Sequence, residues 1–239
     1  IMTSSIDLRD TKCVYINLDK AERNKEEMET QLGSLGFKDF ERLSARVVAP
    51  PTPEPPPEYG SNADTWWNIF RGVAQSHIDI LEANDAPVLI LEDDSMVTDD
   101  FRPILENIPE DTDGIYLGIS QSDGKYSAYD IGSGYAWIRG IFSTHAILYL
   151  SERYKNAVID MAKLLNGAVE YNKVSDACVF YDSIGPNDDK YKFAVFNSAD
   201  IWNFTGKLIT TTIETTAKAI KVGNKFSVFF YYGFEGKKD

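Results

Sequence analysis

The chain has 239 residues, of which 43% are hydrophobic and 13% aromatic, and its formal net charge is −13. This length is sufficient for one domain with a full core, and the composition is that of a folded protein rather than a disordered one. The negative charge argues against a general nucleic-acid or anionic-membrane surface, because such surfaces need clustered Lys and Arg. No apolar run approaches the length of a membrane span, so we expect none.

The two cysteines, Cys13 and Cys178, both stand among apolar residues. Each is expected to be a small core residue rather than half of a disulfide. This pattern favours a reducing compartment, such as the cytoplasm.

The first unit along the chain reads as a strand followed by a helix. Residues 13–18 form a short apolar run that predicts a buried strand, and Asp19 with Glu22 has the spacing of a helix capping box. The helix is expected to end at Gly36. Its apolar stripe is formed by Met28, Leu32 and Leu35. A further strand is expected over residues 40–48.

A proline-rich stretch at residues 50–57 then interrupts the pattern and predicts an extended or polyproline II loop. A helix should follow, capped by Ser61 or Asp64 and ending near Asn84. His77 lies on its apolar stripe, where two interpretations remain open: a hydrogen-bonded core histidine or a functional group facing the site.

Residues 88–94 are the stretch that points most directly to a function. An aliphatic run too short for a helix ends in Glu92, Asp93 and Asp94, which predicts a buried strand whose carboxylates emerge at its carboxyl end. Strand alternation should point Glu92 and Asp94 one way and Asp93 the other. Such carboxylates suit a hard divalent cation, although an acidic turn that only caps the strand would look similar.

The remainder of the chain alternates strands, helices and loops. We expect a short helix or turn over 101–108, a buried strand over 114–118, a glycine-rich loop over 121–134, and two strands within 135–150. A helix should begin at Ser151, and Asp176 precedes an apolar segment over 177–181. A late strand is expected over 193–196, followed by a β-rich end.

These elements predict an α/β fold of one domain, with a mixed, mostly parallel sheet flanked by helices. We divide it into a main part over residues 1–205 and a β-rich extension over 206–239 that packs on the same domain.

Several of these motifs together resemble glycosyltransferase family 25, which includes bacterial lipooligosaccharide galactosyltransferases and procollagen galactosyltransferases. Order and rough spacing match over about residues 12–182. The matching positions are residues 14–19 with Arg23, Ser76-His77, residues 91–94 and residues 116–118. The family's glycine-rich lead into the Ser-His helix is absent here, and little matches beyond Tyr191.

The resemblance implies a GT-A (Rossmann-like) fold, a nucleotide-sugar donor, usually UDP-linked, and Mn²⁺ or Mg²⁺. It implies that Asn17, Asp19 and Arg23 belong to the donor-side motif, that His77 belongs to the Ser-His motif, and that Glu92 and Asp94 bind the metal. Arg23 suits a phosphate contact, but a solvated helix residue beside Glu26 and Glu27 would look the same.

The resemblance also implies an inverting transfer, which needs a carboxylate to take the acceptor proton. We choose Asp176 for this role because it directly precedes an apolar segment that anchors it. An ordinary helix cap is the alternative.

The expected activity is thus transfer of a sugar from a nucleotide sugar to a glycan or other hydroxyl acceptor. Two rival classes remain: a non-catalytic module that binds carbohydrate or a divalent cation, and a phage-type transferase that glycosylates modified DNA bases. The second would need a basic face, whereas the lysines here are scattered.

Overall fold

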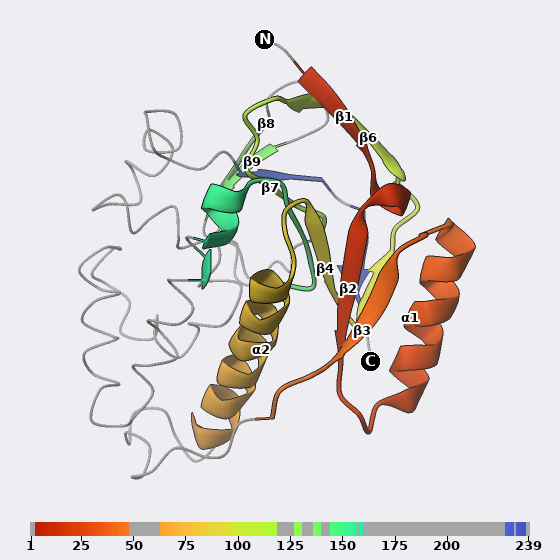
Figure 1. Ribbon diagram of the computed structural model, residues 1–239, viewed down its shortest axis with the longest axis vertical. Helices are drawn as coiled ribbons and strands as arrows, with labels where there is room; N and C mark the ends of the chain where they lie inside the picture. The colour runs from red at the N-terminus through yellow and green to blue at the C-terminus, as the bar shows by residue number, and fades with distance from the viewer. Residues whose placement is uncertain are drawn as a thin grey trace, which may run out of the picture.

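The computed structural model describes residues 3–47, 63–118, 127–130, 136–139, 144–156, 158–159, 228–231 and 233–237. In this part of the chain, helices α1 (Glu22–Leu35) and α2 (Ala63–Ala83) lie on opposite faces of one sheet (Figure 1). The expected proline-rich loop, Cys178, Asp176, the strand over 193–196 and the 205/206 boundary lie outside the described residues.

The main sheet has eight strands in the order β3-β2-β4-β10-β7-β11-β9-β8. They are β2 (Lys12–Asn17), β3 (Phe40–Ser44), β4 (Val88–Glu92), β7 (Gly114–Tyr116), β8 (Ser127–Asp130), β9 (Ala136–Arg139), β10 (Ala146–Tyr149) and β11 (Val228–Phe230). Two smaller sheets pair β1 (Thr3–Asp7) with β6 (Ile104–Pro109) and β5 (Ser95–Val97) with β12 (Phe234–Gly236).

The sheet is mixed, as expected, but its described strands are not mostly parallel. β2 pairs in parallel with β3 and β4, and β7 pairs in parallel with β11. The other four pairings are antiparallel, because β10 opposes both β4 and β7, and β9 opposes both β8 and β11. The parallel arrangement predicted from the first strands therefore holds for β3-β2-β4 and changes at β10.

The short apolar runs form buried strands because both faces of the sheet are covered. Along β2 and β4, alternate side chains enter two separate cores. Val14 and Ile90 face the core that contains α2, whereas Tyr15 and Leu91 face the core that contains α1. A strand buried on both faces needs a continuous apolar run rather than an alternating one.

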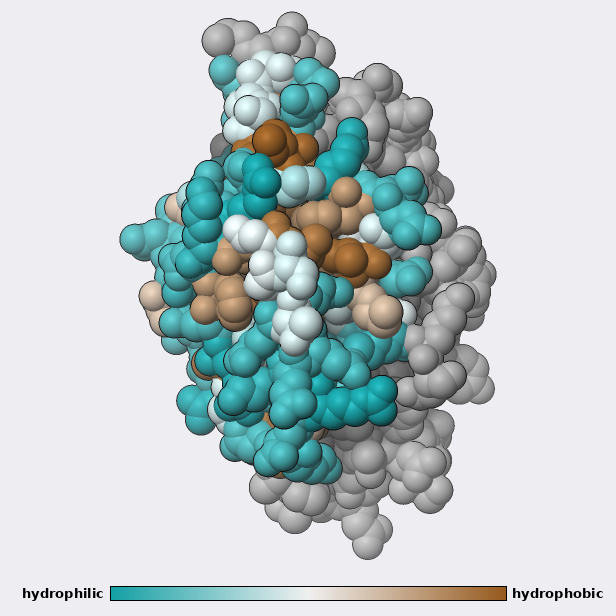
Figure 2. All heavy atoms as spheres, turned by 90° about the vertical axis from the view of Figure 1, so that its right-hand side faces the viewer, coloured by the Kyte–Doolittle hydropathy of each residue, from teal (hydrophilic) through white to brown (hydrophobic). Residues whose placement is uncertain are grey.

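Helix α1 shows a difference from the expected start. Its N-cap is Ala21, which makes no side-chain cap hydrogen bond, so the capping box predicted from Asp19 and Glu22 is wrong. Its end is as predicted: Gly36 adopts φ 83°, and its N–H bonds to the last turn. The side of the molecule that carries α1 is mostly hydrophilic, and apolar side chains gather in its upper half (Figure 2).

The expectation of a helix or turn over 101–108 is also wrong, because most of this stretch belongs to strand β6. Its buried residues are Leu105 and Ile108, three apart, which is a helical spacing. The spacing arises from a register shift in the β1–β6 pair and from a left-handed residue, Asn107, at φ 57°.

Strands near the end of the chain are integral parts of the structure. β11 lies between β7 and β9 in the main sheet (Figure 1), and after it the chain continues beside β7, where Gly233 N–H donates to Leu117 O at 2.8 Å. β12 then pairs with β5, which directly follows the carboxylates of residues 92–94. The β-rich character predicted for this region is confirmed for residues 228–230 and 234–236.

The helix predicted from Ser151 is anchored by a buried aspartate. Ser151 Oγ accepts a hydrogen bond from Tyr154 N–H at 3.2 Å, as an N-cap does. Asp113, only 1% exposed, accepts from Ser151 Oγ at 2.5 Å and from Arg153 Nε and Nη2 at 2.8 and 2.6 Å. The carboxylate of Asp113 therefore fixes the start of this helix to the residue that directly precedes β7.

Replacing Asp113 with Asn should lower the free energy of unfolding by about 1.5–3 kcal/mol, because hydrogen bonds to a charged group are lost. Urea denaturation measures this difference. The neighbouring exposed Asp111, changed to Asn, is the control and should alter stability by less than about 0.5 kcal/mol. Equal stability of the two variants would show that the anchor has no energetic importance.

Candidate functional site

Three neighbouring strands end at one edge of the sheet, which we call the carboxyl edge. In the parallel pairs, Asn17 lies opposite Ser44 and Ile16 lies opposite Glu92. Asp93 N–H donates to Ile16 O at 3.0 Å, so the turn after β4 stays against β2. Asn17, Asp19 and the three carboxylates of residues 92–94, which the resemblance assigns to two separate motifs, therefore lie at the same edge.

Asn17 connects β3, the turn after β4 and the loop before α1 at this edge. It is 1% exposed, and its Nδ2 donates to Asp93 Oδ2 at 2.6 Å and to Ala21 O at 3.0 Å. Its Oδ1 accepts from Arg42 Nε at 2.8 Å. Because these contacts occupy the amide on both sides, Asn17 orients Asp93 and the loop before α1, rather than presenting its amide to a ligand.

Asp19 is held on the outer side of the same cluster. Its Oδ1 accepts hydrogen bonds from Arg42 Nη2 at 2.5 Å and from Ser44 Oγ at 2.7 Å. These bonds hold the pKa of the Asp19 carboxyl below its usual value. Arg42 thus joins Asn17 and Asp19, and we did not identify it from the sequence. An arginine inside a predicted strand, between Glu41 and Leu43, was the available signal.

Glu92 points to the α2 side of the sheet. His77 Nε2 lies 3.1 Å from Glu92 Oε1, within hydrogen-bonding distance, and Thr144 Oγ1 donates to the same oxygen at 2.5 Å. Burial acts to raise the pKa of Glu92, but the His77 and Thr144 hydrogen bonds and the electrostatic influence of the His77 and His145 rings outweigh it and lower the pKa. With Oε1 committed, Oε2 is the oxygen of Glu92 that is left for a cation.

His77 is a buried, hydrogen-bonded histidine, as the first of the two open interpretations expects. It is fully buried in α2, yet it contacts a carboxylate of the predicted metal motif. The adjacent Ser76 has a structural role: its Oγ donates to Gly72 O at 2.8 Å and accepts from Arg46 N–H at 2.9 Å. Ser76 therefore ties the segment after β3 to the helix that carries His77.

Asp94 is exposed as a whole residue, but its carboxyl lies close to protein groups that remove part of its hydration, and among like charges. Desolvation, together with the carboxylates of Glu92 and Asp93, raises its pKa to about 6. Repulsion between carboxylates is the situation that a bound divalent cation relieves, so Asp94 fits the predicted metal chemistry. Within the described ranges, however, no group of three or more His, Cys, Asp or Glu side chains is arranged to hold a metal ion.

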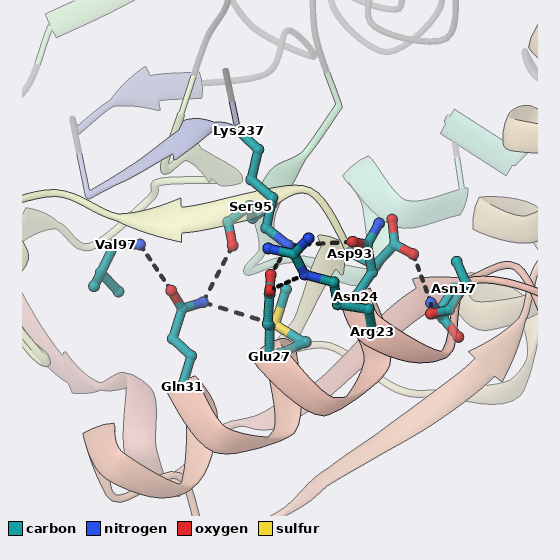
Figure 3. A network of polar contacts seen from close by, with 11 residues as sticks. Asn17, Arg23, Asn24, Glu27, Gln31, Asp93, Ser95, Val97 and Lys237 are labelled. Carbon is teal, nitrogen blue, oxygen red and sulfur yellow. Dashed lines mark hydrogen bonds and ion pairs between the residues drawn. The ribbon is translucent and has the colours of Figure 1, made fainter. Parts of the chain in front are cut away.

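On the opposite side of β4, a hollow of about 470 Å³ lies between α1 and the β5–β12 pair. We call it the α1 hollow. Figure 3 shows Arg23 and Glu27 on α1 close to Lys237, with Asp93 and Asn17 beyond them, while Gln31 points toward Ser95 and Val97. Its lining residues are Arg23, Glu27, Met28, Gln31, Asp93, Ser95, Met96 and Lys237.

The hollow contains a small charge network centred on Glu27. Arg23 Nε donates to Glu27 Oε1 at 2.8 Å, and Lys237 Nζ bonds to Glu27 Oε2. These two contacts keep the pKa of Glu27 below its usual value, and the Lys237 contact has the larger effect. Lys237 also reaches Asn24 Oδ1 at 3.3 Å. Arg23 thus lies at the hollow, whereas His77 and Glu92 are on the other face of the sheet.

Several residues of this edge were not predicted from the sequence: Arg42, Thr144, His145 and Lys237. Thr144 binds Glu92, and His145 O accepts from Glu92 N–H at 2.9 Å. His145 also lies against Gly118, where an added Cβ would come within 2.1 Å of His145 Nε2. Asp176, our candidate base, lies outside the described residues.

No protein-family model matches the chain, and a search of curated proteins returns no match. The resemblance to glycosyltransferase family 25 therefore rests on the motifs alone. Within the part of the chain that the structure describes, no helix has the length and apolar character needed to cross a membrane.

Replacing Arg42 with Lys should lower the free energy of unfolding by roughly 1.5–3 kcal/mol, because an ammonium cannot bond Asn17 and Asp19 in the same fixed geometry. Arg46 is the matched control: it forms an exposed ion pair with Asp79 at 2.6 Å, and Arg46→Lys should cost less than about 0.5 kcal/mol. Chemical denaturation compares them, and an Arg42→Lys variant as stable as the control would contradict the bridging role.

Proposed function

We propose that the chain is a metal-dependent glycosyltransferase. It transfers a sugar with inversion from a UDP-linked donor to a hydroxyl group of a glycan or another acceptor. The observation that carries the proposal is the cluster of three carboxylates at the end of β4. There the pKa of Asp94 is raised to about 6 beside Glu92 and Asp93. The family resemblance of the motifs supplies the reaction class.

The position of these residues supports a ligand site. In open α/β sheets, ligands bind at the carboxyl ends of parallel strands, and β2, β3 and β4 are parallel and end together here. The hollow beside them, about 470 Å³, is of the size that holds a small molecule. These features are general ones, shared by many α/β proteins.

In the proposed mechanism, Asp94, in the turn after β4, and Glu92, through Oε2, would hold a Mn²⁺ or Mg²⁺ ion. A bound ion of this kind neutralises the departing diphosphate as a Lewis acid. Such ions are usually held by one or two carboxylates and substrate phosphates, so a set of three protein ligands is not required. His77 and Thr144 orient Glu92 through its other oxygen.

The remaining steps are assigned to residues of the chain. Asn17 fixes Asp93 and the loop before α1, so that the donor side of the site is preformed. Arg23 lines the α1 hollow, on the other side of β4 from Glu92, and we assign it to the donor's phosphates once it leaves Glu27. Asp176 remains our candidate for the base that takes the proton from the acceptor hydroxyl.

The Asp94→Asn variant tests the metal assignment. It should lose manganese-dependent binding of UDP-sugars while it keeps its fold, because β4 before it supplies the packing. A ligand that binds only the native state raises apparent stability, so thermal shifts with each UDP-sugar, with and without Mn²⁺, measure the loss. Asp99→Asn, a change at an exposed position after β5, is the control and should behave like the parent.

Release of UDP only when an acceptor is present would separate a transferase from a module that merely binds a sugar or a cation. A parent protein that shows no Mn²⁺-dependent shift with any UDP-sugar would contradict the proposal. So would an Asp94→Asn variant that binds and turns over donor like the parent.

The Asp176→Asn variant tests the base. Asn caps a helix about as well as Asp, so a structural role predicts little change. A catalytic base would lose its proton acceptor, and the transfer rate should fall by roughly 10²–10⁴-fold with donor binding intact. A transfer rate within a few-fold of the parent would remove Asp176 from the mechanism.

A further inference from the structure

The α1 hollow combines two positive side chains that come from opposite ends of the sequence. Arg23 lies in the first turn of α1, and Lys237 directly follows β12. Pairing of β12 with β5 brings Lys237 to the hollow, and its N–H donates to Asp94 O at 2.8 Å. The second cation is therefore held in place by the backbone of the predicted metal motif.

The contacts of these two cations with Glu27 are of a kind that an anion can replace. The Arg23 side chain is 90% exposed and that of Glu27 is 41% exposed. The exposed Arg23–Glu27 pair contributes little to stability, typically less than about 1 kcal/mol. Lys237 is less exposed, at 24%, but its partner oxygen on Glu27 belongs to the same half-exposed carboxylate. A phosphoryl group offers several charged oxygens to both cations at once, and Arg binds such groups with two parallel hydrogen bonds.

The size and the remaining lining indicate the class of ligand. About 470 Å³ is far more than a phosphate ion occupies, and the Asp93 carboxylate lines the same space. Asp93 is fixed by Asn17 at 2.6 Å, so it is a preoriented acceptor for hydroxyl groups. The hollow therefore has a cationic part for phosphate and an acceptor part for hydroxyls, as a nucleotide or a sugar phosphate requires.

We infer that Arg23 and Lys237 form the phosphate-binding part of the α1 hollow, and that the Glu27 carboxylate occupies this place until a phosphorylated sugar or nucleotide displaces it. The inference deepens the proposed function, because it assigns Lys237 to the donor's diphosphate and gives Glu27 the role of an internal competitor. It rests on that proposal only for the identity of the ligand, since binding of phosphate itself is tested separately.

The test measures binding of UDP and of inorganic pyrophosphate by calorimetry in EDTA, so that no metal contributes. Arg23→Ala and Lys237→Ala should each weaken the binding of both probes by roughly ten-fold or more. This is the usual scale for loss of a hydrogen bond to a charged group. Lys25→Ala and Glu26→Gln, at exposed positions of the same helix, are the matched controls and should leave binding within about two-fold of the parent.

The Glu27→Gln variant gives the decisive result, because the two explanations predict opposite signs. If Glu27 competes with phosphate, its neutralisation frees both cations and binding of UDP and pyrophosphate should tighten by several-fold. If Glu27 only fastens Lys237 to α1, the same change should loosen the hollow and weaken binding. Weaker binding in Glu27→Gln, or no binding of either probe to the parent at millimolar concentration, would overturn the inference.

The outcomes also separate this inference from the proposed function. Binding of both probes that depends on Arg23 and Lys237, without any sugar transfer, would support the phosphate site and contradict the transferase. Turnover of a UDP-sugar, with UDP binding unchanged in Lys237→Ala, would support the transferase and contradict the role of Lys237.

Discussion

β2 and β4 are hydrogen-bonded in parallel, with Ile16 opposite Glu92, and this register sets where both strands end. Asn17 and the carboxylates of residues 92–94 share one edge because the last paired residues of the two strands are neighbours. A shift of one residue would turn each side chain to the other face of the sheet. Asp93 would then leave Asn17, and Glu92 would leave His77. The polar contacts of the edge thus depend on apolar packing along the strands.

The same register distributes three adjacent acids over the two faces of the sheet. Glu92 is bound on the α2 side by His77 and Thr144, while Asp93 is bound by Asn17 and lines the hollow on the α1 side. Asp94 lies in the turn between them, near both charges. One short acidic motif therefore contributes to two different environments. Substitutions at these three positions should be judged one by one rather than as a single acidic patch.

The elements that were predicted correctly are those whose signal is local. β2 and β4 are continuous apolar runs, because each is buried on both faces, and the end of α1 is marked by Gly36. β6 was mistaken for a helix or turn because a register shift and the left-handed Asn107 put Leu105 and Ile108 at a helical spacing. Asp19 matched a capping box, but Arg42 and Ser44 offer it stronger partners.

Only those residues of the candidate site that lie next to a recognisable strand in the sequence could be predicted. Asp93 and Asp94 follow a recognisable strand, and their position at its end could be expected from the cost of burying charge. Lys237 could not be associated with Glu27, because 210 residues separate them and the β12–β5 pairing that joins them leaves no signature near either. Arg42 lay in a correctly predicted strand, but its two partners depend on how β3 and β2 are aligned.

The place of β11 between β7 and β9 has a consequence for biosynthesis. β9 is hydrogen-bonded to β11 and β8, so a nascent chain that has not yet reached residue 228 lacks the strand that attaches this pair to β7. Until then, the edge of β7 that β11 will cover exposes unpaired backbone groups, the kind of strand edge that other chains can join. Closing so long a loop is also entropically slow. β3, β2, β4, β10 and β7 can pair before residue 228 is synthesised, whereas the β9–β8 pair must wait for β11 before it joins the sheet.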